Sequence, residues 1–566
     1  MKPFWMRWRG VLLAASALVA TPTAFLTGLN PVEVHAQASF DDAKKAYEQG
    51  KKSESRTAME RAVEDIGASG TPEAAKFLLG ELASDQKDRK KGKKGLPGEV
   101  RKKIILALSK FKDEASVKLI GQGALDLNSA PKGGDPTLAL DQFDFFLALS
   151  NMEGVAAADD AVKAAIADND NPYVKVAALE AVRQAGAARF VDAACGVLRE
   201  ENDAWAKEWR IVPINALACL QDIVEPEQTD KVIQVVEAVM AWEQRALDKK
   251  LPSDERVRFF GGRMLTKLTG ETADMASIPY WKWWVAQMKA VGKVDRSQKS
   301  PEKASKTAPP KPVFDAAPVG KRFVFVIDIS KSMELPLKIN LDDIEKRRKA
   351  RTTKGPGEKG DAEPAEDDNP LRKLPWDKID TKMALAREEL ARSIENFEGD
   401  REFAIITYSR EVECVTGGWV KATKDACGKW GREARKLEPD SLTNIHGGLM
   451  MSLRLSAKGT SATNPCVDPD CVLTGADTIV FLTDGWASWS DDSVSQTVDD
   501  PRGGGGKVGD GQFILGDVIV TDILRQNMFR KVVINTVGIG NHDENAMKGL
   551  AKGTGGTYVD WGFKES

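Results

Sequence analysis

The stretch RFVFVIDISKSMELP (Arg322–Pro336) contains an apolar run that stops at an acidic residue. Residues 322–327 are rich in valine, phenylalanine and isoleucine, as expected of a strand that is covered on both faces of a sheet. Asp328, Ser330 and Ser332 then follow at alternate positions, so their oxygens can turn toward one point. The stretch therefore predicts a buried strand that ends where a polar loop begins.

The rest of the C-terminal part alternates between strand-like and helix-like segments. Apolar, β-rich runs predict strands at 322–327, 402–408, 478–483, 532–539 and 557–561. Apolar residues at helical spacing predict helices at 381–397, 444–455, 516–527 and 544–554. This order predicts an α/β fold with a doubly wound, mostly parallel sheet, and such sheets bind ligands beyond the carboxyl ends of their strands.

Two further polar residues are expected at this same edge of the sheet. Thr443 comes just before the helix predicted at 444–455, and Asp484 directly follows the strand predicted at 478–483. With Asp328, Ser330 and Ser332 they supply two carboxylates and three hydroxyls. Oxygen donors of this kind suit a hard divalent cation such as Mg²⁺.

These elements resemble the metal-ion-dependent adhesion site of von Willebrand factor type A domains. The resemblance lies in Asp328-x-Ser330-x-Ser332, then Thr443, then Asp484 within the sequence LTDG. It implies that the three hydroxyls bind the metal directly, and that the two carboxylates bind it directly or through water. One departure is the sequence DSL before the threonine, where the family usually has a small, glycine-rich lead-in.

The resemblance covers residues 321–566 and implies a Rossmann-like domain of this family. Such a domain would bind Mg²⁺, or Mn²⁺ or Ca²⁺, and use the ion to hold a carboxylate of a protein ligand. Trp486 and Trp489 are candidate ligand contacts beside the metal, although ordinary packing accounts for them nearly as well. His446 is either a neighbour that tunes the metal site or, by our preference, a histidine on a helix surface.

Residues 40–292 are predicted to form an all-α domain. Four segments open with an apolar or aromatic residue followed by Lys or Arg, and a unit of about 37 residues places a fifth copy at 140–154. This spacing predicts stacked helix pairs that resemble HEAT-like repeats, with an irregular helical bundle as the alternative. A second protein partner on these repeats is a further expectation. The four segments start at Val100, Val174, Trp209 and Val257.

Several segments lie outside these two domains. Residues 1–36 read as a signal peptide with cleavage after Ala36 or Ala38, which predicts export to the periplasm or the cell exterior. No later run is long and apolar enough to span a membrane. We expect a Pro- and Lys-rich linker at 293–320, a charged insertion at 337–377 and a flexible Gly-rich loop at 499–512.

Six cysteines and a near-neutral charge limit the remaining chemistry. An even number of cysteines in an exported chain suggests disulfides, and buried free thiols are the alternative. The formal net charge of −3 gives no indication of nucleic-acid binding. Zinc is not expected, because histidines are scarce and no CxxC motif occurs. The simplest disulfides would join neighbours in sequence: Cys195 with Cys219, Cys414 with Cys427, and Cys466 with Cys471.

The sequence is compatible with three functions. The first is a non-enzymatic binding or adhesion protein that holds a protein ligand through the metal. The second is a metal-assisted hydrolase, which lacks an evident nucleophile–base pair in this sequence. The third is a structural scaffold, in which the helical repeats are the active part and the C-terminal domain is a spacer.

Overall fold

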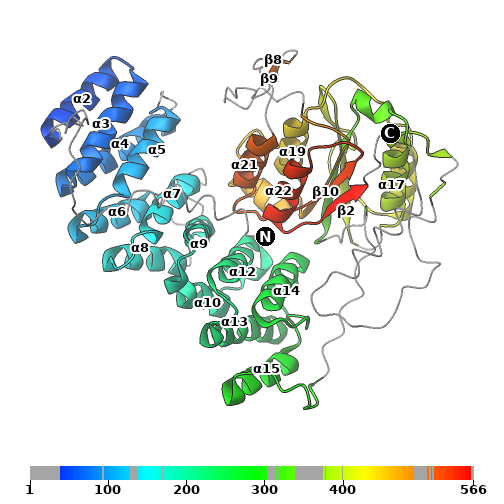
Figure 1. Cartoon of the computed structure of the whole chain (residues 1–566), viewed down its shortest axis with the longest axis horizontal. Helices are drawn as coiled ribbons and strands as arrows, with labels where there is room; N and C mark the ends of the chain where they lie inside the picture. Colours follow the sequence, from blue (N-terminus) through cyan, green and yellow to red (C-terminus); the bar gives the residue numbers. More distant parts are fainter. Residues whose placement is uncertain are drawn as a thin grey trace, which may run out of the picture.

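A helical N-terminal region and an α/β C-terminal domain make up the computed structural model of the chain (Figure 1). The predicted signal peptide lies outside the described residues, as do most of the linker, the charged insertion and the Gly-rich loop. The structure describes residues 39–91, 93, 95–127, 138–168, 170–301, 314, 319–337, 374–375, 378–397, 400–487, 507–508, 511–512 and 516–561.

The N-terminal region consists of consecutive helices, as the sequence predicts. Ser and Asp side chains, which accept from the first free backbone N–H groups, cap several of them, as at Ser55 before α3 and Asp254 before α14. The helices are α2 Phe40–Lys52, α3 Arg56–Ser69, α4 Pro72–Lys90, α5 Gly98–Leu108, α6 Glu114–Asp126, α7 Leu138–Ser150, α8 Ala156–Ala167, α9 Pro172–Ala185, α10 Val191–Arg199, α11 Ala204–Lys207, α12 Ile211–Ile223, α13 Thr229–Asp248, α14 Glu255–Thr269 and α15 Ile278–Val291.

These helices pack in two layers that follow one another along a curved array (Figure 1). In one layer α3, α5, α7, α9, α12 and α14 contact one another in that order. In the other layer α4, α6, α8, α10, α13 and α15 do the same. The five segments that suggested a repeat are α5, α7, α9, α12 and α14, so they all lie in the first layer. The all-α architecture is confirmed, and the HEAT-like character of the repeats stays a prediction.

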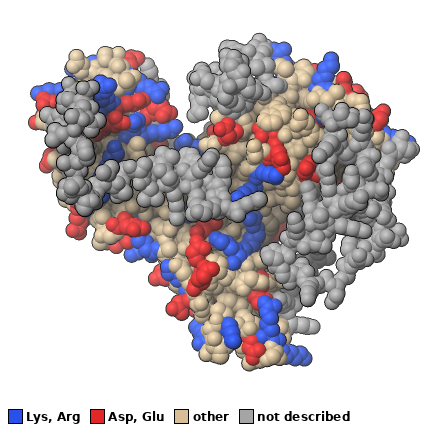
Figure 2. Space-filling model, in the orientation of Figure 1, with Lys and Arg blue, Asp and Glu red and all other residues tan. Residues whose placement is uncertain are grey.

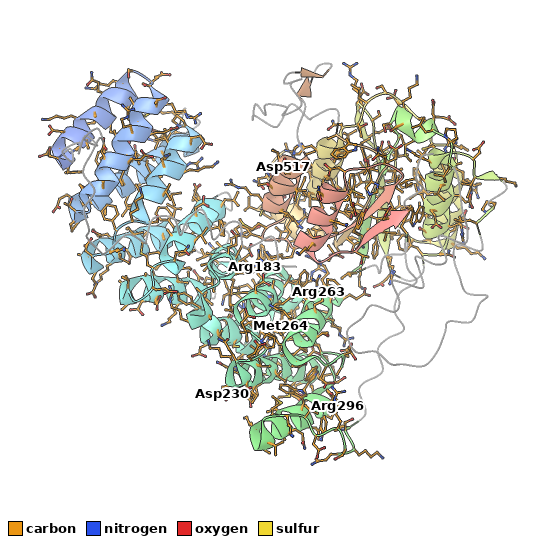
Figure 3. All side chains as sticks on the ribbon, viewed as in Figure 1. Arg183, Asp230, Arg263, Met264, Arg296 and Asp517 are labelled. Carbon is orange, nitrogen blue, oxygen red and sulfur yellow. The ribbon has the colours of Figure 1, made fainter. Side chains whose placement is uncertain are left out.

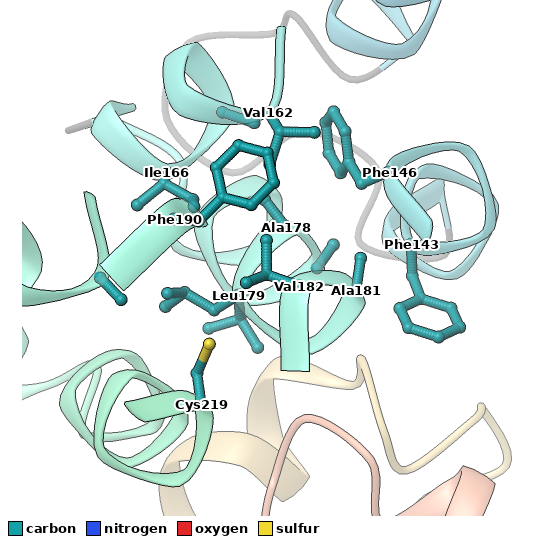
Figure 4. Packing of buried hydrophobic residues seen from close by; sticks show 14 of the residues in the cluster. Phe143, Phe146, Val162, Ile166, Ala178, Leu179, Ala181, Val182, Phe190 and Cys219 are labelled. Carbon is teal, nitrogen blue, oxygen red and sulfur yellow. The ribbon is translucent and has the colours of Figure 1, made fainter. Parts of the chain in front are cut away.

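Small and aromatic side chains fill the space between the layers (Figure 4). Phe146 of α7 and Phe190, which precedes α10, are fully buried beside Val162 of α8. Alanines on α9, such as Ala178 and Ala181, leave room for these rings. Burying a large apolar side chain contributes about 1.5–3 kcal/mol, so these contacts are the main source of stability in the array.

The C-terminal domain is built on one mostly parallel sheet, as predicted. Its strand order β11-β10-β7-β1-β2-β3 places β1 between β2 and β7, so the chain winds outward from β1 in both directions. Its strands are β1 Arg322–Asp328, β2 Glu402–Tyr408, β3 Val412–Cys414, β4 Val420–Lys421, β7 Thr478–Thr483, β10 Val533–Ile539 and β11 Tyr558–Trp561.

Helices cover both faces of this sheet, which explains why its strands are apolar throughout. Phe323, Phe325 and Ile327 of β1 belong to the core beneath α17 and α18. Val324 and Val326 belong to the core on the other face, beneath α19, α21 and α22. The helices are α17 Lys382–Glu395, α18 Lys424–Ala434, α19 Ile445–Arg454, α20 Pro469–Thr474, α21 Gly516–Gln526 and α22 Glu544–Thr554.

Short elements complete the domain and were not predicted. Strands β3 and β4 pair antiparallel with β2 at the edge of the sheet, and a turn of 3₁₀ helix spans Lys331–Glu334 after β1. A small ribbon joins β5 Leu455–Ser456 to β6 Gly459–Thr460. Within the predicted Gly-rich loop, β8 Lys507–Val508 pairs antiparallel with β9 Gly511–Gln512, and the flexibility of the loop stays a prediction.

The helical layer of α9, α12 and α14 packs against the amino ends of the parallel strands. Asn215 of α12 donates a 2.7 Å hydrogen bond to the backbone carbonyl of Phe529, which precedes β10. The ring of Phe529 packs edge-on against Phe143 of α7, with 6.4 Å between ring centroids. The ammonium of Lys531 lies 2.7 Å from the carboxylate of Glu180 on α9. Apolar packing and ion pairing together therefore join the two domains.

Arginines of α14 extend this contact along the same edge. Arg256 is buried and lies 3.4 Å from Asp477, the residue just before β7, and it also donates to the carbonyl of Arg530. Arg263 donates to the carbonyl of Gly555, between α22 and β11. Figure 3 shows Arg263, and Arg183 of α9, on helices that lie next to the α/β domain. The interface therefore runs across the starts of at least three strands.

The cysteine prediction is wrong in this structure, because all six cysteines are free thiols. A disulfide between Cys414 and Cys427 is prevented by the sheet that separates them, since Cys414 packs in the core on one face and Cys427 in the core on the other. Cys219 points its sulfur toward Leu179 among apolar side chains (Figure 4). Burial raises the pKa of the Cys195 thiol to about 12, as expected of an inert thiol.

The surface charge is mixed, in keeping with the small net charge. Figure 2 shows Lys and Arg side chains interspersed with Asp and Glu over the helical region. Many of these are paired, as for Lys289 with Glu237 at 2.6 Å and Lys249 with Asp203 at 3.2 Å. Within the described ranges, no helix is both long and apolar enough to cross a membrane.

Candidate metal centre

The predicted polar residues meet at the carboxyl ends of β1 and β7. The two strands are parallel neighbours, with Ile327 opposite Leu482. Asp328 is the last residue of β1, and Asp484 directly follows β7. Their carboxyl groups therefore emerge at the same edge, opposite the edge that contacts the helical array.

Asp328 is fully buried, and three donor groups lie within hydrogen-bonding distance of its carboxyl oxygens. Its Oδ1 accepts a 2.8 Å hydrogen bond from the backbone N–H of Ser330. Its Oδ2 accepts from the hydroxyl of Thr483 at 2.7 Å and lies 3.2 Å from the hydroxyl of Tyr408. Burial, and after it the negative charge of Asp484, raise the pKa of Asp328 to about 6. The site thus concentrates negative charge that a cation would stabilise.

The serines connect the loop after β1 to the end of β7. The hydroxyls of Ser330 and Ser332 lie 3.0 Å apart, and Ser332 donates a 2.7 Å hydrogen bond to Oδ1 of Asp484. Asp484 and Ser330 are 1% and 2% exposed. Four of the five residues proposed from the sequence, Asp328 among them, are therefore joined by hydrogen bonds within this small space.

Thr443 reaches the site through the loop that precedes α19. This loop runs beside the one after β1: the N–H of Asp440 donates to the carbonyl of Ile329 at 2.6 Å, and that of Lys331 to the carbonyl of Ser441 at 3.2 Å. Thr443 is buried within it, at 8% exposure. The structure therefore brings the segment that carries Thr443 against the segment that carries the serines.

The other candidate residues near the site, His446 and Trp486, differ in their exposure to solvent. His446 is not a surface histidine: it is 1% exposed, and its Nε2 lies 2.9 Å from Asp522 of α21. Although burial opposes the change, the bond from His446 lowers the pKa of Asp522. Trp486 is 52% exposed, so it does not pack in the core and is accessible to a ligand. Trp489 lies outside the described residues.

Three residues of the site were missed by the sequence reasoning. Thr483 ends β7 and donates to Asp328, and Tyr408 ends β2 with its hydroxyl 3.2 Å from the same carboxylate. Lys382 begins α17, and its Nζ lies 3.1 Å from Oδ2 of Asp484. Tyr408 and Thr483 could have been predicted, because each is the last residue of a strand that ends at the edge where the acidic residues were expected. For Lys382 the sequence offered only its position at a helix start.

The side chains present fit a hard divalent cation. Two carboxylates offset its charge, and uncharged hydroxyls add oxygen ligands, which is the donor set that Mg²⁺ prefers. The buried carboxylates already accept hydrogen bonds, so the donors are held in place by Thr483 and by the neighbouring backbone. Such a cation would supply a positively charged centre that can accept an oxygen ligand from another molecule.

No protein-family model matches the chain, and no curated protein matches it. Among solved structures, it is similar to a von Willebrand factor type A protein from Catenulispora acidiphila, at 15% identity and a TM-score of 0.25, over 43% of this chain and 39% of that chain. This chain thus spans about two fifths of that protein's length.

Two other solved structures are similar over the same share of the chain. One is the conserved hypothetical protein BatB from Bacteroides thetaiotaomicron, at 10% identity and a TM-score of 0.23, over 43% of this chain and 91% of that chain. The other is an aerotolerance-related membrane protein from Bacteroides fragilis, at 10% identity and a TM-score of 0.22, with the same coverage. The α/β fold of this chain is established by its own strand order.

Proposed function

We propose that the chain is an exported, non-enzymatic binding protein of the von Willebrand factor type A class. Its C-terminal domain binds Mg²⁺, or Mn²⁺ or Ca²⁺, and the ion holds a carboxylate of a protein ligand. The metal ligands are the five oxygen-bearing side chains singled out above: Asp328, Ser330, Ser332, Thr443 and Asp484.

One observation carries this proposal: the hydrogen-bonded path from Ser330 through Ser332 to Asp484, next to the buried Asp328. Two buried carboxylates near each other are unfavourable unless something of opposite charge compensates them. Lys382 compensates one of the two charges, at Asp484, and a divalent cation among these oxygens would compensate the rest. The same convergence of hydroxyls and carboxylates is what the resemblance to the metal-ion-dependent adhesion site implies.

The surroundings of the site favour binding of a macromolecule. Trp486 is half-exposed two residues after Asp484, and an aromatic ring beside a charged centre is a common anchor for a protein ligand. The helical array contacts the opposite edge of the sheet, so it leaves this edge clear of its contacts. A ligand carboxylate would therefore reach the metal without displacing the helical region.

Calorimetric titration of the full-length protein with Mg²⁺ and with Mn²⁺ tests metal binding. We expect one ion per chain for the wild type and at least tenfold weaker binding when Asp328→Ala and Asp484→Ala are combined. The control is Glu402→Ala, because Glu402 begins β2 at the opposite edge of the sheet, where it pairs with Arg322 at 2.9 Å. Unchanged affinity in the double variant, with an intact fold, would exclude these carboxylates as ligands.

Capture of protein partners from the native source, with and without a chelator, tests the use of the metal. We expect partners that are retained in Mg²⁺ and released by the chelator. Partners retained in both conditions would indicate binding through the helical array instead. N-terminal sequencing of the mature protein from cell fractions tests export, with cleavage expected after Ala36 or Ala38.

A further inference from the structure

A buried lysine lies within the candidate metal site. Lys382 is 2% exposed, and its Nζ lies 3.1 Å from Oδ2 of Asp484, whose other oxygen accepts from Ser332. The ammonium therefore sits against one of the two carboxylates that would bind the metal. It belongs neither to the oxygen donor set nor to the sequence motif.

The position of Lys382 opposes the local electrostatic preference of a helix. It is the first residue of α17, directly after the capping residue Thr381. The amino end of a helix carries a partial positive charge that disfavours a lysine and favours an acidic residue. Burial of an ammonium adds a further penalty unless a partner compensates it. The carboxylate of Asp484 supplies that compensation.

The lysine side chain is also fixed sterically. The backbone N–H of Lys382 donates to the carbonyl of Leu335 at 3.2 Å, which attaches the start of α17 to the loop after β1. On the other side lies Gly540, after β10, with a φ of +69°. A Cβ at Gly540 would come within 3.0 Å of Cε and 3.2 Å of Nζ of Lys382. Glycine thus supplies both the turn and the space that the lysine needs.

The charges at the site follow from these contacts. Asp328 and Asp484 carry two negative charges when ionised, and Lys382 returns one positive charge close to Asp484. Without the lysine, the metal-free site would hold two buried carboxylates facing each other with less compensation. When the lysine is present, a metal ion that binds Asp484 lies close to the positive charge of Lys382. Like charges repel strongly at short range in a protein interior, so the lysine opposes metal binding.

We propose that Lys382 is a tethered cation with two effects on this site. It keeps the metal-free site assembled by compensating Asp484, and it weakens metal binding so that the ion exchanges readily. The inference rests on the proposed metal binding and adds a regulatory element to it. It predicts that removing the positive charge tightens metal binding, whereas a lysine that only positions Asp484 for the metal would weaken binding when removed.

The test compares full-length wild type with Lys382→Met by Mg²⁺ titration calorimetry. We expect a Kd for Mg²⁺ at least tenfold smaller in the variant. We also expect a lower unfolding temperature in EDTA and a larger rise on adding Mg²⁺. The control is Lys175→Met, since Lys175 is equally buried and lies 2.6 Å from Glu200, far from this site in the helical array. It should change stability without changing Mg²⁺ affinity.

Unchanged or weaker Mg²⁺ binding by Lys382→Met would overturn the inference. If neither protein binds Mg²⁺, the proposed metal binding fails together with it. If only the variant binds, the lysine inference stands, and the wild type is not a metal-binding protein under those conditions. If Lys382→Met does not fold in EDTA, we expect it to refold in millimolar Mg²⁺. We expect the same of a second variant, Lys382→Gln. Failure of both variants to refold in Mg²⁺ would count against the inference.

Discussion

At the scale of single residues, the hydroxyl of Thr483 is the clearest structural support of the candidate site. It donates a 2.7 Å hydrogen bond to Oδ2 of Asp328. The hydroxyl of Tyr408 lies 3.2 Å from the same oxygen, but also 3.0 Å from the carbonyl of Leu482, and its single hydrogen can serve only one of them. Thr483 is therefore the side chain on which the orientation of this buried carboxyl group depends most.

We expect Thr483→Val to lower the free energy of unfolding by about 1–3 kcal/mol, because it leaves a buried carboxylate oxygen short of a donor. Urea unfolding in EDTA measures this without any contribution from a metal. The control is Thr407→Val. Thr407 is a buried threonine of β2 on the same face as Phe403 and Ile405, which is the face of the sheet opposite to that of Thr483. Equal stability of the two variants would show that the Thr483 hydroxyl does not hold Asp328.

At the scale of elements, the close approach of α19 to the sheet positions the loop that carries Thr443. The contact is made at Gly448, where a Cβ would come within 3.0 Å of the ring of Tyr408 and 3.1 Å of Val326. Because α19 starts two residues after Thr443, any displacement of the helix displaces this loop as well. The glycine therefore links packing in the core to the geometry of the site.

Gly448→Ala should therefore destabilise the protein by about 1–3 kcal/mol, the usual effect of overpacking a close contact. The matched control is Gly196→Ala in α10, where nothing lies within 4 Å of the added Cβ. There the same substitution should stabilise by about 0.5–1 kcal/mol, since alanine favours a helix more than glycine does. Thermal unfolding of both variants measures the difference, and a Gly448→Ala protein as stable as wild type would contradict it.

The elements that the sequence predicted best are those with a single dominant signal. Strand β1 was expected at 322–327 and spans Arg322–Asp328, and helix α22 was expected at 544–554 and spans Glu544–Thr554. Burial on both faces makes such strands continuously apolar, and one buried face gives such helices their spacing. The meeting of Asp328, Ser332 and Asp484 was also predictable, because parallel strands bring their carboxyl ends to one edge.

What the sequence did not predict depends on contacts between distant segments. Helix α18 was missed because the residues that it buries, Cys427, Gly431 and Ala434, are too small to stand out as an apolar face. Strands β3 and β4 are too short to produce a pattern. Lys382 was missed because its partner, Asp484, lies far away in the sequence. The disulfide prediction was wrong because it relied on closeness in sequence, whereas Cys414 and Cys427 pack in cores on opposite faces of the sheet.

At the scale of the whole molecule, the two edges of the parallel sheet have different roles. The amino edge is occupied by α9, α12 and α14, whose apolar core is continuous with residues of the α/β domain such as Phe529 and Val533. The carboxyl edge carries the candidate metal site. A continuous core and buried ion pairs imply that the helical array and the α/β domain form one cooperative unit, with the site held at a fixed orientation to the array.

Substitution of Glu180, which pairs with Lys531, tests whether the helical array and the α/β domain unfold as one cooperative unit. Glu180 is 1% exposed, and although burial opposes it, the charges of Arg183 and Lys531 lower the pKa of Glu180 to about 2. Glu180→Ala leaves Lys531 without its carboxylate, while Arg183 keeps Asp222 as a partner at 2.7 Å. We expect a loss of about 3–5 kcal/mol at pH 7, because the ammonium of Lys531 is largely buried at the interface. Loss of this contact should also split a single thermal unfolding transition into two, one for each domain.

The pH dependence of this effect distinguishes an ion pair from simple packing. Because the pKa of Glu180 is lower in the folded protein than its ordinary value of 4.5, its contribution is complete above pH 4.5 and is lost as pH falls toward about 2. The difference in unfolding free energy between wild type and Glu180→Gln should therefore shrink over this range. The control is Glu237→Gln, which alters an exposed pair with Lys289 and should show almost no difference at any pH. A constant difference between wild type and Glu180→Gln would mean that Glu180 joins the domains by shape and hydrogen bonding, and that its charge does not matter.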